Sequence, residues 1–153
     1  MQPWQRQAYR PKKSDLDILL IDPWLITLDS QTGVPLALPV DVQVVNPLCF
    51  MVQKFLIQTH RSKAKQAQDL LYVYDTIELF GALLPEFHTS WRDVIKPELK
   101  GLSDQVQKAV DATFSNVNDL IRAAARIPQD RQLSPEQMQM TCQLAFEQIL
   151  DTS

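Results

Sequence analysis

Two runs of apolar residues with helical spacing lie next to each other near the middle of the chain, at residues 46–81. In the first run, the apolar positions that recur every three or four residues are Leu48, Met51, Val52, Phe55 and Leu56. In the second run they are Ala67, Leu70, Leu71, Tyr74, Ile77 and Phe80. Asn46 and Pro47 are typical of a helix start, and Gly81 is typical of a helix end. The pattern predicts a helical hairpin with a polar joint at 59–62.

The residues before this hairpin follow strand patterns. The apolar run at 16–21 has the length of a strand and is stopped by Asp22 and Pro23. Valines alternate at positions 40, 42 and 44, as in a half-buried strand, and turn-forming Gly and Pro residues precede them. Because a sheet of two or three strands is too small to be stable alone, we expect the helical hairpin to cover it.

Three further helices are expected after residue 81. One covers 84–95 and ends before Pro97, a long one runs from residue 97 or 103 to 126, and the last begins at Ser134 as its capping residue. The last two carry continuous apolar stripes: Leu99, Leu102, Val106, Val110, Phe114, Val117, Ile121 and Ala124, and then Met138, Cys142, Ala145, Phe146 and Ile149. So much apolar surface beside a small sheet predicts a homodimer through the C-terminal helices.

The order of these elements favours an α+β fold, with a small N-terminal sheet of two or three strands covered by a helical hairpin and followed by a mostly helical C-terminal part. We expect a single domain at 14–153, in which 14–45 form the sheet portion and 46–153 the helical portion. Residues 1–13, which are polar and rich in Arg and Lys, predict a mobile basic arm.

Composition narrows the class of protein. The net charge of −3 and the pI near 5.3 argue against a protein that coats nucleic acid. No apolar run approaches the ~18 residues of a membrane span, and the N-terminus is too polar for a secretion signal, so we expect a cytoplasmic protein with no membrane contact. Three glycines exclude a Walker loop and a GxGxxG turn, and two histidines with two distant cysteines exclude a zinc site. The two cysteines are expected to be buried free thiols.

Four polar residues of the helical hairpin are expected to converge near its open end. Lys54 lies on the first helix, Arg61 lies in the joint, and Lys65 and Asp69 lie one turn apart on the second helix. We expect Asp69 to be paired with a cation. Chemistry alone allows these residues to be a solvated charged rim with one i,i+4 ion pair, or a functional site.

Two further carboxylates, Asp15 and Asp17, alternate along the expected strand at 16–21. Their side chains would point to one face, close enough to share a divalent cation. Nucleotidyl transfer needs such a pair, because carboxylates fix two Mg²⁺ ions that orient the attacking oxygen and neutralise charge on the triphosphate. The simpler interpretation is that both aspartates flank the start of a buried strand.

The order of these residues resembles the helical segment that follows the catalytic sheet in bacterial nucleotidyltransferase-fold proteins of the DNA polymerase β-like superfamily, particularly the abortive-infection-type and related uncharacterised branches. The residues that carry the resemblance are Val44, Val45, Asn46 and Pro47 at a strand end, followed by Lys54, Arg61, Lys65 and Asp69. The resemblance covers residues 14–95. It implies transfer of a nucleoside monophosphate from an NTP to a hydroxyl acceptor, with Mg²⁺ as cofactor and with Lys54, Arg61, Lys65 and Asp69 binding the nucleotide or its phosphates.

The family pattern allows two placements of Asp15 and Asp17. They look like the Asp-x-Asp metal pair, but the Gly-Ser motif that precedes that pair would then fall near Pro3 and Trp4, and neither residue matches it. The placement we prefer gives Asp15 or Asp17 the position of the third carboxylate, on a later strand, so that the first half of the catalytic sheet is missing. Under either placement we expect an incomplete active site that retains binding of an NTP or another polyanion. The alternative is a non-catalytic helical binding or assembly module that acts through a protein partner.

Overall fold

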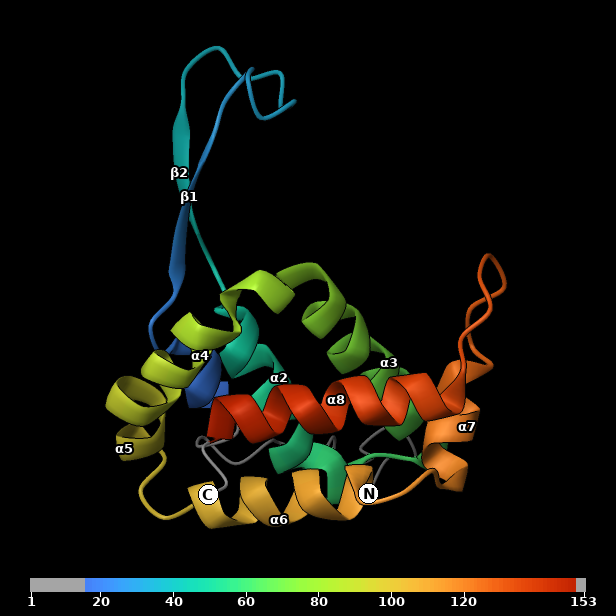
Figure 1. Cartoon of the computed structure of the whole chain (residues 1–153). Helices are drawn as coiled ribbons and strands as arrows, with labels where there is room; N and C mark the ends of the chain where they lie inside the picture. The colour runs from blue at the N-terminus through green and yellow to red at the C-terminus, as the bar shows by residue number, and fades with distance from the viewer. Residues whose placement is uncertain (1–15, 151–153) are drawn as a thin grey trace, which may run out of the picture.

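The structure, a computed structural model, describes residues 16–150 (Figure 1). The expected basic arm at 1–13 and Asp15 lie outside these described residues. The fold is α+β, as expected: a two-stranded antiparallel sheet near the N-terminus is followed by a mostly helical body. Among the described residues, none of the helices combines the length and the apolar character needed to cross a bilayer.

The sheet is a β-hairpin formed by β1 (Trp24–Leu28) and β2 (Val40–Val44), with Trp24 opposite Val44 and Leu28 opposite Val40. β2 is the strand predicted from the alternating valines. The hairpin projects from the helical body instead of lying against it (Figure 1). Helical cover is limited to its base, where the Trp24 ring meets the Phe80 ring edge-on with their centroids 5.5 Å apart.

The prediction of a strand at 16–21 is wrong. These residues form a short helical stretch that includes the 3₁₀ helix η1 (Ile18–Leu20), and the first strand begins only after Pro23. A short apolar run without alternation does not distinguish a strand from a buried helical turn. Here the turn buries Ile18 almost completely and leaves Leu20 75% exposed, because only one side of η1 packs against the helical body.

The predicted helical hairpin is confirmed. It consists of α2 (Pro47–Ile57), a short 3₁₀ turn η2 (Gln58–His60) and α3 (Lys63–Phe80), which ends just before Gly81. Asn46 caps α2 by accepting a 2.9 Å hydrogen bond from the backbone N–H of Leu48. Its amide also donates to the backbone oxygen of Asp22 at 3.2 Å, which ties the base of the β-hairpin to the start of α2.

A bent helix follows α3 through the short turn η3 (Gly81–Leu83). It comprises α4 (Leu84–Ser90), the π-helical segment η4 (Trp91–Ile95) and α5 (Lys96–Glu98). The helix therefore continues through Pro97 to Glu98, and the prediction that it ends before Pro97 is wrong. Pro97 lies in the first turn after η4, where the missing amide of proline is tolerated.

The long helix predicted up to residue 126 is two helices, α6 (Ser103–Phe114) and α7 (Asp119–Ala125). Asn118 causes the break, since its side chain accepts from the backbone N–H of Ile121 at 3.0 Å and donates to the backbone oxygen of Thr113 at 2.9 Å. An Asn side chain that satisfies the start of one helix and the end of another stabilises the interruption.

The last helix, α8 (Pro135–Leu150), crosses the helical body (Figure 1) and is capped by Ser134 as predicted. It meets α2 and α6 through three phenylalanines: the Phe146 ring lies 5.2 Å from that of Phe55 and 5.8 Å from that of Phe114. The stripes expected to bind a second copy are thus largely buried within one protomer, including Val106, Val110, Phe114, Ile121, Ala124, Met138, Cys142, Ala145, Phe146 and Ile149. The homodimer prediction assumed that these helices expose apolar surface that one protomer cannot bury. Because that surface is buried, this reason for a dimer no longer holds.

Candidate functional site

A buried carboxylate lies at the joint between α2 and α3. Asp69, on α3, is 5% exposed, and its two oxygens accept from two cations. The Nζ atom of Lys54 lies 3.2 Å from Oδ1, and Arg61 donates from Nε to Oδ2 at 2.8 Å and from Nη2 to Oδ1 at 3.1 Å. The expectation that Asp69 pairs with a cation is confirmed, because a carboxylate this deeply buried requires charged partners.

The backbone around Arg61 is fixed as firmly as its side chain. The Gln66 side chain, one turn into α3, donates to the backbone oxygens of Gln58 at 2.9 Å and of Arg61 at 3.0 Å. The N–H of Arg61 also donates to the backbone oxygen of Gln58 at 3.1 Å. The guanidinium of Arg61 is therefore held at both ends, by Asp69 and by its own anchored backbone.

A pocket of about 350 Å³ opens beside this guanidinium. Its described lining residues come from three parts of the chain: Gln53 and Ile57 of α2, His60, Arg61 and Ser62 of the joint, Lys65 of α3, and Leu16. Ser62 caps α3, so the pocket also lies at the N-terminus of an 18-residue helix, where the backbone dipole favours anions. Arg61 and Lys65 supply its strongly cationic side.

The four residues predicted to converge therefore play different structural parts. Lys54 pairs with Asp69, its ammonium stands 4.8 Å from the centre of the Phe50 ring, and it is not among the described residues that line the pocket. Lys65 lines the pocket with Arg61 and is exposed. The structure thus brings Lys54, Arg61 and Asp69 together as one ion-paired cluster, and brings Lys65 next to that cluster through the pocket.

Asp17 does not join this site. It is exposed and lies in the helical turn before η1, so the expected placement of Asp15 and Asp17 on one face of a strand fails with the strand itself. Asp17 lines a different hollow, together with Glu98 and Lys100 at the end of α5. Within residues 16–150, no group of three or more His, Cys, Asp or Glu side chains is arranged to hold a metal ion.

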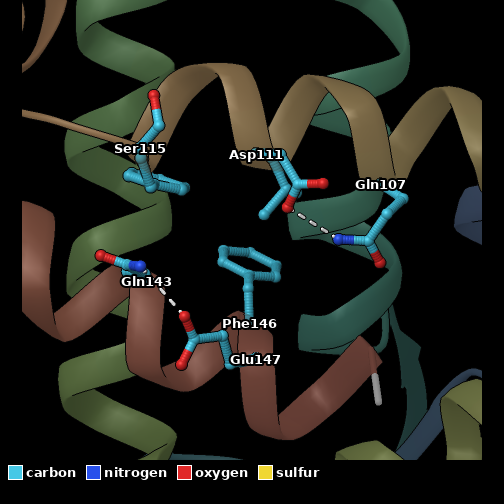
Figure 2. A pocket seen from close by; sticks show the side chains of 8 residues that line it. Gln107, Asp111, Ser115, Gln143, Phe146 and Glu147 are labelled. Atoms are coloured by element: carbon cyan, nitrogen blue, oxygen red, sulfur yellow. Dashed lines mark hydrogen bonds between the residues drawn. The ribbon is translucent and has the colours of Figure 1, made fainter. Parts of the chain in front are cut away.

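A third hollow, of about 130 Å³, lies between α6 and α8 (Figure 2). Val110, Phe114 and Phe146 form its apolar lining. The polar side chains at its edge bond to each other, Gln107 to Asp111 at 2.9 Å and Gln143 to Glu147 at 3.0 Å (Figure 2). Because these groups satisfy one another along their own helices, this hollow is better explained by helix packing than by ligand binding.

Of the polar residues that line the α2–α3 pocket, Arg61 and Lys65 were assigned a binding role from the sequence, but Gln53 was not. Gln53 was expected only on the flank of its helix, yet it is 9% exposed and lines the pocket. Its spacing offered a signal, since it lies one helical turn before Ile57, the last residue of α2.

Comparison with known proteins identifies the family of the chain. Residues 7–96 match the model of a protein family described as nucleotidyltransferase. The match contains the α2–α3 hairpin, the ion-paired cluster and the pocket, and it ends within the bent helix before α6. No curated protein and no solved structure matches the chain. More than half of the sequence is covered by the match, and the chain belongs to this nucleotidyltransferase family.

Proposed function

We propose that this chain binds a nucleoside triphosphate at the α2–α3 joint, with the phosphates on Arg61 and Lys65. The observation that carries the proposal is the guanidinium of Arg61, which Asp69 holds by one edge at the wall of a pocket. A guanidinium has five N–H donors, and Asp69 takes two of them. The remaining donors are available to a phosphate, for which an arginine fork is well suited.

The charges of the site favour an anion with more than one negative charge. Lys54, Arg61 and Lys65 supply three positive charges, and Asp69 neutralises one of them. The N-terminus of α3 adds its partial positive charge at the same place. Lys54 and Asp69 act in this proposal as positioning residues, since they orient Arg61 without lining the pocket.

The reaction we infer is that of the family, transfer of a nucleoside monophosphate to a hydroxyl acceptor. Mg²⁺ would neutralise charge on the triphosphate in that reaction. The described residues do not fit such an ion, because no three or more His, Cys, Asp or Glu side chains among them are grouped to hold a metal, and Asp17 shares its hollow with one other carboxylate, that of Glu98. We therefore derive no catalytic step through Mg²⁺, and propose nucleotide binding as the part of the function that residues 16–150 perform. The order of Pro47, Lys54, Arg61, Lys65 and Asp69 supports our proposal that the protein is a cytoplasmic bacterial protein of the abortive-infection-type branch or a related uncharacterised branch.

Calorimetric titration with ATP tests the proposal. The matched variants are Lys65→Gln, which removes an exposed lysine of the pocket, and Lys108→Gln, which removes an exposed lysine of α6. We expect Lys65→Gln to weaken ATP binding by about tenfold and Lys108→Gln to leave it unchanged. Added salt should weaken binding further, since the contact is electrostatic. Equal affinities for the parent chain and both variants would contradict a phosphate site at the joint.

One observation favours a second role, in protein assembly. Every cross-strand pair on one face of the β-hairpin is apolar, and the face consists of Trp24, Ile26, Leu28, Val40, Val42 and Val44. Ile26 remains 38% exposed and Val40 46% exposed, which is unusual for a sheet face without charges. A second copy of the chain would cover this face with an identical apolar face, in place of the dimer once expected through the C-terminal helices. Light scattering should then give a dimer that Val42→Asp converts to a monomer, and a monomer at all concentrations would contradict it.

A further inference from the structure

Gln53 is a largely buried residue whose side-chain amide makes no hydrogen bond to the described residues. The residue is 9% exposed, and across the described part of the chain its carboxamide makes no hydrogen bond. No fully buried side-chain nitrogen or oxygen among the described residues lacks a partner, so the Gln53 amide must be open to solvent at some point. The pocket that Gln53 lines at the α2–α3 joint is that opening. An amide placed this way is prepared for hydrogen bonds from a ligand.

The pocket is chemically divided. Arg61 and Lys65 form a cationic side, and Leu16 and Ile57 supply apolar surface. Gln53 and Ile57 lie one turn apart on α2, so the amide and this apolar surface share a face of the helix. Lys54, the next residue after Gln53, points instead to Asp69.

A nucleotide has the same division. Its phosphates are anionic, its base has flat apolar faces, and the edge of the base offers a donor and an acceptor side by side. A carboxamide also offers one donor group and one acceptor, and it pairs with such an edge through two hydrogen bonds. The volume of about 350 Å³ lies within the range of roughly 300–1,000 Å³ that is usual for small-molecule sites.

We propose that Gln53 selects the base of the bound nucleotide, by hydrogen bonding to the edge of a nucleobase whose phosphates lie on Arg61 and Lys65. This inference rests on the proposed nucleotide binding and adds a specificity-determining residue to it. The four bases differ in the order of donor and acceptor along this edge and in its distance from the phosphates, so a carboxamide held on α2 fits one base better than the others. A base that fits poorly leaves polar atoms of the site unpaired, which weakens its binding. Gln53 therefore gives the chain a preference among the four NTPs that the phosphate contacts alone do not provide.

The test compares two kinds of probe. Affinities for ATP, GTP, CTP and UTP are measured by calorimetry, together with the affinity for inorganic tripolyphosphate, which has phosphates but no base. The variants are Gln53→Leu, which keeps the size of the side chain but removes its polar groups, and Gln53→Asn, which keeps the amide but shortens its reach. Gln105→Leu, at an exposed position of α6, is the control, and circular dichroism confirms the fold of each variant.

We expect the parent chain to prefer one NTP over the others. Gln53→Leu should weaken the binding of that NTP by about tenfold and make the affinities for the four NTPs similar. Its affinity for tripolyphosphate should stay within about twofold of that of the parent chain. Gln53→Asn should also lose the preference. Unchanged NTP affinities with normal tripolyphosphate binding would overturn the role of Gln53 and leave the phosphate site intact. An equal loss for tripolyphosphate and NTPs would also overturn it, because Gln53 would then act on the phosphates or on the fold. Absence of tripolyphosphate and NTP binding in the parent chain would instead refute the proposed function itself.

Discussion

Arg61 and Asp69 form a two-point contact across the joint of the helical hairpin, with Nε donating to Oδ2 at 2.8 Å and Nη2 donating to Oδ1 at 3.1 Å. The two residues lie eight positions apart, so the contact closes the turn between α2 and α3 and fixes the angle at which the guanidinium meets the pocket. Paired, two-point geometry restricts a side chain more than a single ion pair does. The same contact therefore contributes to both stability and binding in this account.

The contribution of the buried Asp69 cluster to stability can be compared with that of an exposed ion pair, Asp75 with Arg131, in which Asp75 lies on the same helix. Asp69→Ala removes the carboxylate that Lys54 and Arg61 share, and leaves two partly buried cations without a partner. We expect the free energy of unfolding to fall by about 3 kcal/mol. Asp75→Ala removes the partner of Arg131, whose side chain is 42% exposed, and should cost less than about 1 kcal/mol. Urea denaturation measures both values, and equal losses would contradict the special burial of Asp69.

The buried thiol of Cys49 predicts a loss of stability at alkaline pH. Burial, and secondarily the Asp22 carboxylate, raises the pKa of Cys49 from 9.0 to about 12. A group whose folded pKa is raised keeps its proton in the folded state while the unfolded chain loses it. Its stabilising contribution is therefore complete below pH 9 and is lost as the pH rises towards 12, at up to about 1.4 kcal/mol per pH unit.

Urea denaturation between pH 8 and 11 checks this prediction. Cys49→Ala should be less stable at pH 8, because it leaves a small cavity, but its stability should fall less steeply with pH. The thiol should also react slowly with Ellman's reagent at pH 8 until the chain is unfolded. Rapid reaction of both cysteines in the folded protein would show that their burial is wrong.

The β-hairpin should open far more readily than the helical body. Its strands make few contacts outside their own pair, and Leu25 is 66% exposed, whereas Ile77 on α3 and Ile149 on α8 are buried. Local opening free energy follows such contact density. In hydrogen exchange, the amides of β1 and β2 should exchange much faster than those of α3 and α8. This prediction applies to the monomer, since a dimer through the hairpin face would protect these amides. Equal protection at a protein concentration where light scattering gives a monomer would contradict it.

We expect no catalytic turnover from this chain alone. The sequence contains no Gly-Ser turn in register with Asp15 and Asp17 to hold the β- and γ-phosphates, and such positioning contributes on the order of 7–11 kcal/mol to catalysis. The assay incubates the chain with each labelled NTP, Mg²⁺ or Mn²⁺, and a pool of tRNA and protein acceptors. Metal-dependent transfer of label that disappears in an Asp15→Ala, Asp17→Ala double variant would contradict the expectation.

The sequence predicted the helical hairpin well because its local signals agree with its packing. The caps Asn46 and Ser62, the stop at Gly81 and the helical spacing of the apolar residues all indicate the same two helices, and the structure forms them. The convergence of Arg61 on Asp69 followed from the same spacing. Agreement between local and tertiary preferences is what makes an element predictable.

Other elements depended on tertiary contacts that the sequence pattern does not reveal. The apolar residues at 16–21 form a helical turn because Ile18 fills a place beside α2, and a short apolar run fits either structure. The break at Asn118 was hidden because apolar spacing continues across it. Gln53 was missed for a related reason: its importance comes from its place in the wall of a pocket, which only the packed structure reveals.

The most direct test of the α2–α3 site is a nuclear magnetic resonance titration of the ¹⁵N-labelled chain with ATP. The account predicts that the largest shifts occur in the side-chain Nε–H of Arg61, the side-chain amide of Gln53 and the backbone amides of Ser62 and Lys65, with saturation at one equivalent of ATP. Asp17 and its neighbours, which line a different hollow, should hardly shift. Shifts centred on Asp17, or on the hollow between α6 and α8, with none at Arg61 would contradict the account.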